Sequence, residues 1–76
     1  MARKVKIIVA SGINADYYDV KEEGQPSRTF GCWDKTKLKE YIKGADVEWV
    51  RGRNAFNGKP VSDSLYNLMV EGITGA

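Results

Sequence analysis

Apolar and polar residues alternate near the amino terminus in the pattern of a half-buried strand. From Arg3 to Ala10 an apolar residue occupies every second position, so these side chains share one face of an extended chain, while Lys4 and Lys6 fall on the other. The segment 11–14 contains glycine and asparagine, which tolerate the positive φ of a chain reversal, and a second strand pattern follows over 15–22. We expect the two strands to pair.

The next two segments predict a third strand and a helix. A glycine- and proline-containing break at 23–27 precedes a short aromatic segment, 28–33, which is typical of a strand. Asp34 is suited to cap a helix over 35–43, because its carboxylate can accept the free amides of the first turn. The apolar residues of this helix recur at i, i+3, i+4 and i+7, and they are Leu38, Tyr41, Ile42 and Ala45.

A fourth strand and a turn follow the first helix. The strand is expected over 47–51, directly after a polar break. In the glycine- and asparagine-rich segment 52–60, the dipeptide Asn57-Gly58 favours a tight type I′ hairpin turn, and a plain loop is the alternative. The sequence leaves both open.

The last segment predicts a second helix with a wide apolar arc. Ser62 or Asp63 can cap it. Tyr66 and Val70 lie four residues apart and widen the arc to about half of the circumference, more than one core contact requires. We therefore expect Tyr66 and Val70 to be covered by the preceding segment 52–60, by a second subunit or by a target protein. The main face consists of Leu65, Leu68, Met69, Gly72 and Ile73.

The order of elements predicts one α+β domain over residues 1–76, a small antiparallel sheet of three to four strands with two helices packed on one face (β-β-β-α-β-α). A chain of 76 residues with 42% hydrophobic and 29% charged residues folds around one modest core. Its single cysteine excludes an internal disulfide, and the absence of histidine excludes the common zinc sites. A homodimer is the remaining way to add stability.

The composition also argues against catalysis. Without histidine the chain has neither the usual general base near neutral pH nor a Ser-His or Cys-His nucleophile. The glycines do not form phosphate-loop or dinucleotide spacings, and we expect Cys32 to be a buried structural thiol. We therefore expect no enzyme, no catalytic residue, no metal and no cofactor.

Two groups of basic residues are candidates for contact with nucleic acid or an acidic partner. The net charge of +2 is too small to indicate a nucleic-acid binder by itself. An ordinary solvated lysine face is the simpler interpretation of the first group. The groups are a row at four-residue spacing on the first helix, Lys35, Lys39 and Lys43, and a cluster around the following ribbon, Arg51, Arg53 and Lys59.

Aromatic residues suggest a protein interface instead. Tyr17 and Trp33 fall on the strand face opposite the expected core, and such side chains are enriched at interfaces. Together with Tyr66 and Val70 they predict a small non-enzymatic protein-binding module. The alternative is a nucleic-acid-binding protein that uses the two basic groups.

The layout of the chain bears on its source. In length and element order it resembles several phage-encoded inhibitors of host defence, including some anti-CRISPR proteins, which implies an inhibitor of a host protein but assigns no residue. No apolar segment is long enough to cross a bilayer. We expect a cytoplasmic protein without membrane contact, in the host cell if it is phage-encoded.

Overall fold

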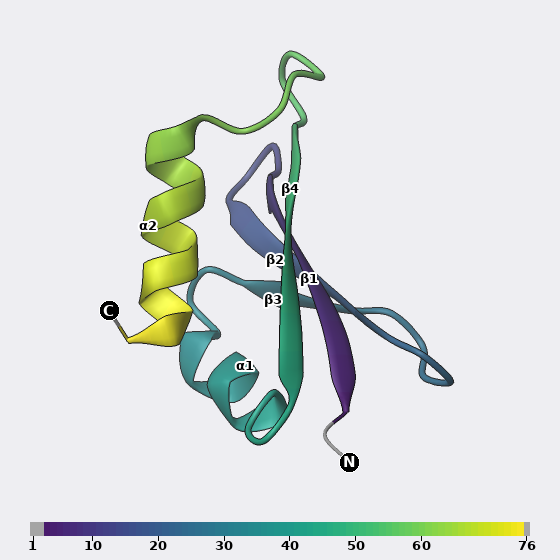
Figure 1. Cartoon of the computed structure of the whole chain (residues 1–76). Coiled ribbons are helices and arrows are strands. Elements are labelled where there is room, and N and C mark those ends of the chain that lie inside the picture. The colour runs from purple at the N-terminus through teal and green to yellow at the C-terminus, as the bar shows by residue number, and fades with distance from the viewer. Residues whose placement is uncertain (1–2, 76) are drawn as a thin grey trace.

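The computed structural model describes residues 3–75, and its elements follow the expected order. The strands and helices are β1 (Lys4–Ser11), β2 (Asp16–Glu22), β3 (Arg28–Gly31), α1 (Lys35–Tyr41), β4 (Asp46–Asn54) and α2 (Asp63–Thr74), as labelled in Figure 1.

The four strands form one mixed sheet in the order β3-β2-β1-β4. The pairs β1/β2 and β2/β3 are antiparallel as expected, but β4 runs parallel to β1, so the expectation of a purely antiparallel sheet is wrong for this strand. The reason is the crossover through α1. It returns the chain to the end of the sheet where β1 begins, with Asp46 beside Lys4, so β4 must run in the direction of β1.

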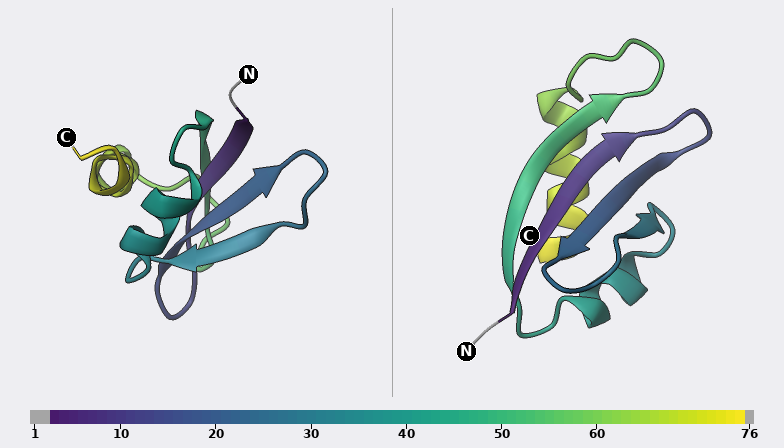
Figure 2. Two further views of the ribbon diagram at one scale, coloured as in Figure 1. Left: turned by 90° about the horizontal axis from the view of Figure 1, so that it is seen from below. Right: turned by 90° about the vertical axis from the view of Figure 1, so that its right-hand side faces the viewer.

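Both helices cover one face of the sheet, as expected, and the other face carries no helix (Figure 2, right). The strand register explains the core, because Val5, Ile7 and Val9 share a face with Val20 and Tyr18 of β2. Helix residues complete it. The buried cluster consists of Val5, Ile7, Val9, Tyr18, Val20, Leu38, Met69 and Ile73.

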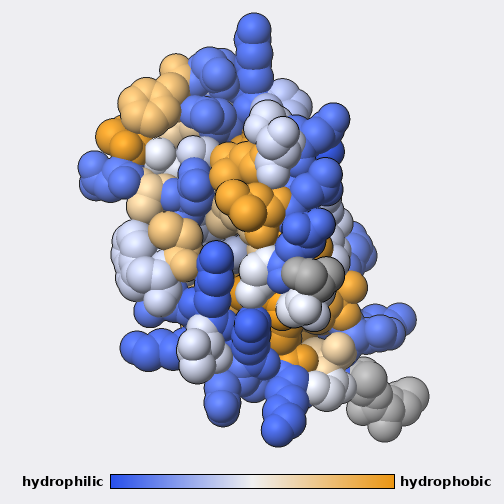
Figure 3. All heavy atoms as spheres, turned by 90° about the vertical axis from the view of Figure 1, so that its left-hand side faces the viewer, coloured by the Kyte–Doolittle hydropathy of each residue, from blue (hydrophilic) through white to orange (hydrophobic). Residues whose placement is uncertain are grey.

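The side of α2 that meets the sheet includes Leu65, Met69 and Ile73 as expected, but it is rotated away from Leu68. Met69 and Ile73 are buried, but Leu68 is 64% exposed, so its assignment to the core face is wrong. Tyr66 and Val70 pack against the core instead, which moves the centre of the contact away from Leu68. Figure 3 shows an apolar patch over the middle of this side of the molecule, bordered by hydrophilic residues.

The segment from β3 to the end of α1 is less regular than the pattern predicted. Strand β3 ends at Gly31, so Cys32 lies beyond it and is half-buried rather than a core residue. Asp34 occupies the N-cap position without a side-chain hydrogen bond. Helix α1 ends at Tyr41 and leaves Lys43 in the following turn, where Gly44 adopts a left-handed φ of 79°.

One buried hydrogen bond joins the sheet to α2. The Tyr18 side chain is fully buried, and its hydroxyl donates to the carbonyl oxygen of Met69 at 2.7 Å. Burial raises the pKa of Tyr18 to about 12, and the nearby Cys32 and Asp16 add to the rise. The phenol therefore stays protonated and keeps donating its hydrogen bond over a wide pH range.

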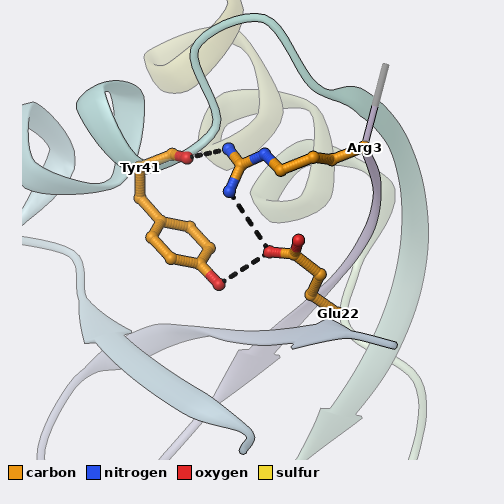
Figure 4. A network of polar contacts seen from close by, with 3 residues as sticks. All are labelled: Arg3, Glu22 and Tyr41. Carbon is orange, nitrogen blue, oxygen red and sulfur yellow. Dashed lines mark hydrogen bonds and ion pairs between the residues drawn. The ribbon is translucent and has the colours of Figure 1, made fainter. Parts of the chain in front are cut away.

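A second polar network joins α1 to the start of the sheet (Figure 4). The guanidinium of Arg3 donates to the Tyr41 carbonyl oxygen and to Glu22 at 3.3 Å, and the Tyr41 hydroxyl donates to the same Glu22 oxygen at 2.9 Å. The hydrogen bond to Glu22 raises the pKa of Tyr41. Arg3 and Arg28 also lie over the Tyr41 ring, 5.3 and 5.1 Å from its centroid.

Within residues 3–75, no helix has the length and apolar character that crossing a membrane requires.

Candidate functional site

The segment after β4 is a loop closed by a single antiparallel bridge. Arg53 pairs with Pro60, and the Asn54 amide donates to the carbonyl oxygen of Lys59 at 2.8 Å. Gly58 has a φ of 66°, and within the described residues only glycines have a positive φ. Asn57 therefore lacks the conformation that a type I′ turn needs at both central positions. The structure has a closed six-residue loop over 54–59, which we call the Phe56 loop.

Side chains fix the shape of the Phe56 loop. The side-chain oxygen of Asn54 accepts a hydrogen bond from the Phe56 amide at 2.8 Å, and that of Asn57 accepts one from the Lys59 amide at 2.9 Å. The Arg53 guanidinium donates to the Gly58 carbonyl oxygen at 3.0 Å. The loop is thus held in one conformation by its own residues, and it presents Phe56 with 72% of its surface exposed.

The Phe56 loop is attached to the turn between β1 and β2. The Ala55 amide donates to the Ser11 carbonyl oxygen at 2.9 Å. The same turn exposes 73% of Ile13. Because β1 and β4 are parallel, the segments that follow them lie at one end of the sheet (Figures 1 and 2). We call Ile13 and Phe56 the apolar tips.

The structure brings Tyr17 and Trp33 together on the sheet face that carries no helix. Tyr17 is the partner of Gly31 in the β2/β3 register. The Trp33 ring lies directly over this glycine, since a methyl group at Gly31 would be only 2.6 Å from the Trp33 Cε2 atom. Trp33 is 73% exposed and Tyr17 is partly exposed, so both aromatic side chains are accessible on this face of the sheet.

The lysines of α1 do not form the expected row. The Lys35 side chain lies against α2, where a methyl group at Gly72 would be 3.0 Å from its Nζ atom. Lys39 is exposed in the last turn of α1, and Lys43 lies beyond the end of the helix. The three ammonium groups therefore do not line one helix face.

The second basic group takes part in contacts within the chain. Arg51 forms an ion pair with Asp63, and its guanidinium lies over the Tyr66 ring, 5.0 Å from the centroid. Arg53 is bound to the Phe56 loop. Lys59 is exposed at the end of that loop. Positive charge is present around Phe56, but part of it stabilises the local fold.

Tyr66 and Val70, the expected interface residues of α2, are half-buried. Both pack against the core cluster, and Arg51 covers the Tyr66 ring. Most of the extra width of the apolar arc of α2 is therefore covered by other residues of the same chain. Leu68 is the large apolar residue of α2 that stays exposed.

The sequence interpretation considered Phe56 only as a ring that could stack on a base, and it missed Ile13. Both stand between residues typical of turns, Ile13 after Gly12 and Phe56 before Asn57. A large apolar side chain in a polar turn has no strand or helix face on which to be buried. That local conflict was the available signal for exposure.

The helix-free face also carries a trough of about 770 Å³ near the start of β1. Its lining mixes three lysines with carboxylates, and it includes Lys4, Lys6, Lys21, Glu23, Asp46 and Glu48. Within residues 3–75, no three carboxylate or thiol groups are placed to hold a metal ion.

Comparison of the chain with protein-family models, with curated proteins and with solved structures found no match.

Proposed function

We propose that this protein is a small non-enzymatic protein-binding module, and that its main binding surface is the end of the sheet with the apolar tips. The observation that carries this proposal is the exposure of Phe56 on a loop held by its own hydrogen bonds. Burial of a phenylalanine side chain stabilises a contact by about 1.5–3 kcal/mol. This chain leaves that contribution available to a partner.

The fixed conformation of the loop supports the same proposal. Ordering a flexible side chain or loop on binding costs about 0.5–1.5 kcal/mol per immobilised side chain. The hydrogen bonds that the side chains of Asn54 and Asn57 accept from the Phe56 and Lys59 amides fix the loop backbone before any partner arrives, so binding has to order only the side chains. An aromatic anchor on a preformed loop is typical of residues that dominate protein interfaces.

The aromatic pair Tyr17 and Trp33 extends the proposed surface onto the helix-free face of the sheet. A partner that contacts the apolar tips and this pair would cover one end of the molecule and leave α2 free. An inhibitor of a host protein, as the resemblance in layout implies, is one form of such a module. Inhibition by this route would come from blocking a surface, without any reaction.

A pull-down tests the proposal. The tagged protein is used as bait in nuclease-treated cell lysate, and the captured proteins are compared between the wild type, Phe56→Ser and Leu68→Ser. We expect one partner to be retained by the wild type and by Leu68→Ser and lost from Phe56→Ser. Leu68 is the matched control, because it is exposed to a similar extent on α2.

A loss of partner binding in the pull-down can be distinguished from a loss of folding by measuring the stability of the variant. Phe56 is 72% exposed, so Phe56→Ser should unfold at the same urea concentration as the wild type. Capture of the same partner by Phe56→Ser with unchanged yield would refute the placement of the surface.

Nucleic-acid binding is the second candidate function. Phe56 stands between Arg53 and Lys59 in the chain, and an exposed ring flanked by cations can stack on a base while the cations meet phosphates. Fluorescence anisotropy with short single- and double-stranded DNA and RNA at low salt tests it. Tight binding that weakens steeply with salt and is lost in Phe56→Ser would favour this function over protein binding.

A further inference from the structure

Strand β4 has a free outer edge along its first half. It is the last strand of the sheet, and no strand of residues 3–75 lies beyond it (Figure 2, right). The Asp46 amide donates to the Arg3 carbonyl oxygen at 2.6 Å, so the main-chain groups of Asp46 point toward β1. In a parallel pair the direction alternates along the strand, which turns the N–H and C=O groups of Val47 and Trp49 outward. The second half of β4 is closed, since the Val61 amide donates to the Gly52 carbonyl oxygen at 3.1 Å.

The open half of the edge has only part of the protection that usually prevents strand addition, namely the charges of Asp46 and Glu48. Natural edges are shortened, carry lysine or proline, or are interrupted by bulges. The opposite edge strand, β3, has only four residues. Between Asp46 and Val50, β4 contains no lysine and no proline, and its register with β1 shifts only after Arg51. This segment can therefore accept another strand.

A second copy of the chain does not fit this edge in a symmetric antiparallel pair. Pairing centred on Glu48 places the two Glu48 carboxylates opposite each other. Pairing centred on Val47 places Asp46 opposite Glu48, again with like charges. Pairing centred on Trp49 requires Asp46 of the second copy to lie beside Gly52, where Val61 already lies. The occupant is then a different chain.

The charges of the edge indicate the chemistry of that chain. On the helix-free face β4 presents the carboxylates Asp46 and Glu48, both exposed. On the other face it presents Val47 and Trp49, both partly exposed beside the core. Opposite charges on neighbouring strands stabilise a sheet, and apolar side chains there pack together. A complementary strand alternates basic and apolar residues.

We propose that the first half of the β4 edge binds an extended segment of another protein that carries lysine or arginine on one face and apolar residues on the other. The segment adds a fifth strand to the sheet. Main-chain hydrogen bonds to Val47 and Trp49 hold it, and Asp46 and Glu48 select its basic residues. This surface is separate from the apolar tips.

A synthetic peptide provides a direct test. The probe is a seven-residue peptide of alternating valine and lysine, and the control is the same peptide with glutamate in place of lysine. Binding is followed by amide chemical shifts and hydrogen exchange of the ¹⁵N-labelled protein. We expect the lysine peptide to slow amide exchange at Val47 and Trp49, and to bind about tenfold more tightly than the glutamate peptide.

Two variants separate this proposal from the proposed function. Glu48→Lys should remove the preference between the two peptides, because Asp46 keeps its charge. Since Glu48 lies opposite Lys6 in the β1/β4 register, the urea midpoint of this variant should fall slightly. Phe56→Ser should bind both peptides as the wild type does. Shifts confined to the Phe56 loop, equal affinity of the wild type for both peptides, or no slowing of exchange at Val47 and Trp49 would each overturn the proposal.

Discussion

Replacement of Tyr18 by phenylalanine removes one hydroxyl from the centre of the core. The side chain is 0% exposed, and its hydroxyl donates to the Met69 carbonyl oxygen at 2.7 Å. That oxygen lies inside α2 and also accepts a helical hydrogen bond, so Tyr18→Phe leaves no buried acceptor without a partner. We expect the variant to lose about 1 kcal/mol of unfolding free energy near neutral pH. For a domain of this size the melting temperature would fall by about 4–8 °C.

The same substitution should become stabilising in alkali. Burial raises the pKa of Tyr18 from 10.0 to about 12, which means that the folded protein holds the phenolic proton more tightly than the unfolded chain. The resulting stability is complete below about pH 10 and is lost as the pH rises toward about 12, at about 1.4 kcal/mol per pH unit. The phenylalanine variant has no such proton. The wild type should therefore lose its advantage near about pH 11 and be the less stable protein above it.

Urea unfolding followed by far-UV circular dichroism measures both effects. The wild type and Tyr18→Phe are compared at several pH values from about 7 to about 11.5. The two proteins differ only at residue 18, so the difference between the two unfolding free energies isolates Tyr18. If that difference is the same at about pH 11 as near neutral pH, the phenol is not buried as the structure has it.

Three further substitutions test other contacts by the same unfolding measurement. Ser62→Ala removes the N-cap of α2 and should lower the unfolding free energy by about 1 kcal/mol, whereas Ser64→Ala, two residues further along, should change it by less than about 0.5 kcal/mol. Gly52→Ala should cost about 1–3 kcal/mol, because the added methyl group would lie 2.7 Å from a backbone oxygen of β1. Tyr41→Phe removes the hydroxyl that donates to Glu22 and should cost about 1 kcal/mol. A variant with the stability of the wild type would show that its contact is not formed.

The strands and helices could be predicted because their patterns are local. The alternation in β1 and the capping residue Ser62 depend on neighbours a few positions away, and both are found where they were expected. Leu68 and Cys32 were placed wrongly for the opposite reason. Whether a residue at the border of an apolar arc, or at the end of a strand, is buried depends on which other elements pack there.

The candidate site was only partly predictable on the same grounds. Tyr17 lies on the helix-free face because side chains alternate along a strand, and this follows from the sequence. The contact of Trp33 with Gly31 and the exposure of Phe56 do not follow, since both depend on how a loop folds back in three dimensions. The lysine row failed because α1 ends before Lys43.

The crossover into β4 sets both its direction and its place in the sheet, and these two features create the two proposed surfaces. If β4 were antiparallel to β1, the Phe56 loop would lie at the end of the sheet with residues 23–27, far from Ile13. The parallel arrangement instead joins the two tips through the bond from Ala55 to Ser11. The crossover also places β4 on the outside of β1, where its first half has no neighbouring strand within residues 3–75. A short helical crossover, rather than any single residue, therefore determines where this chain can meet a partner.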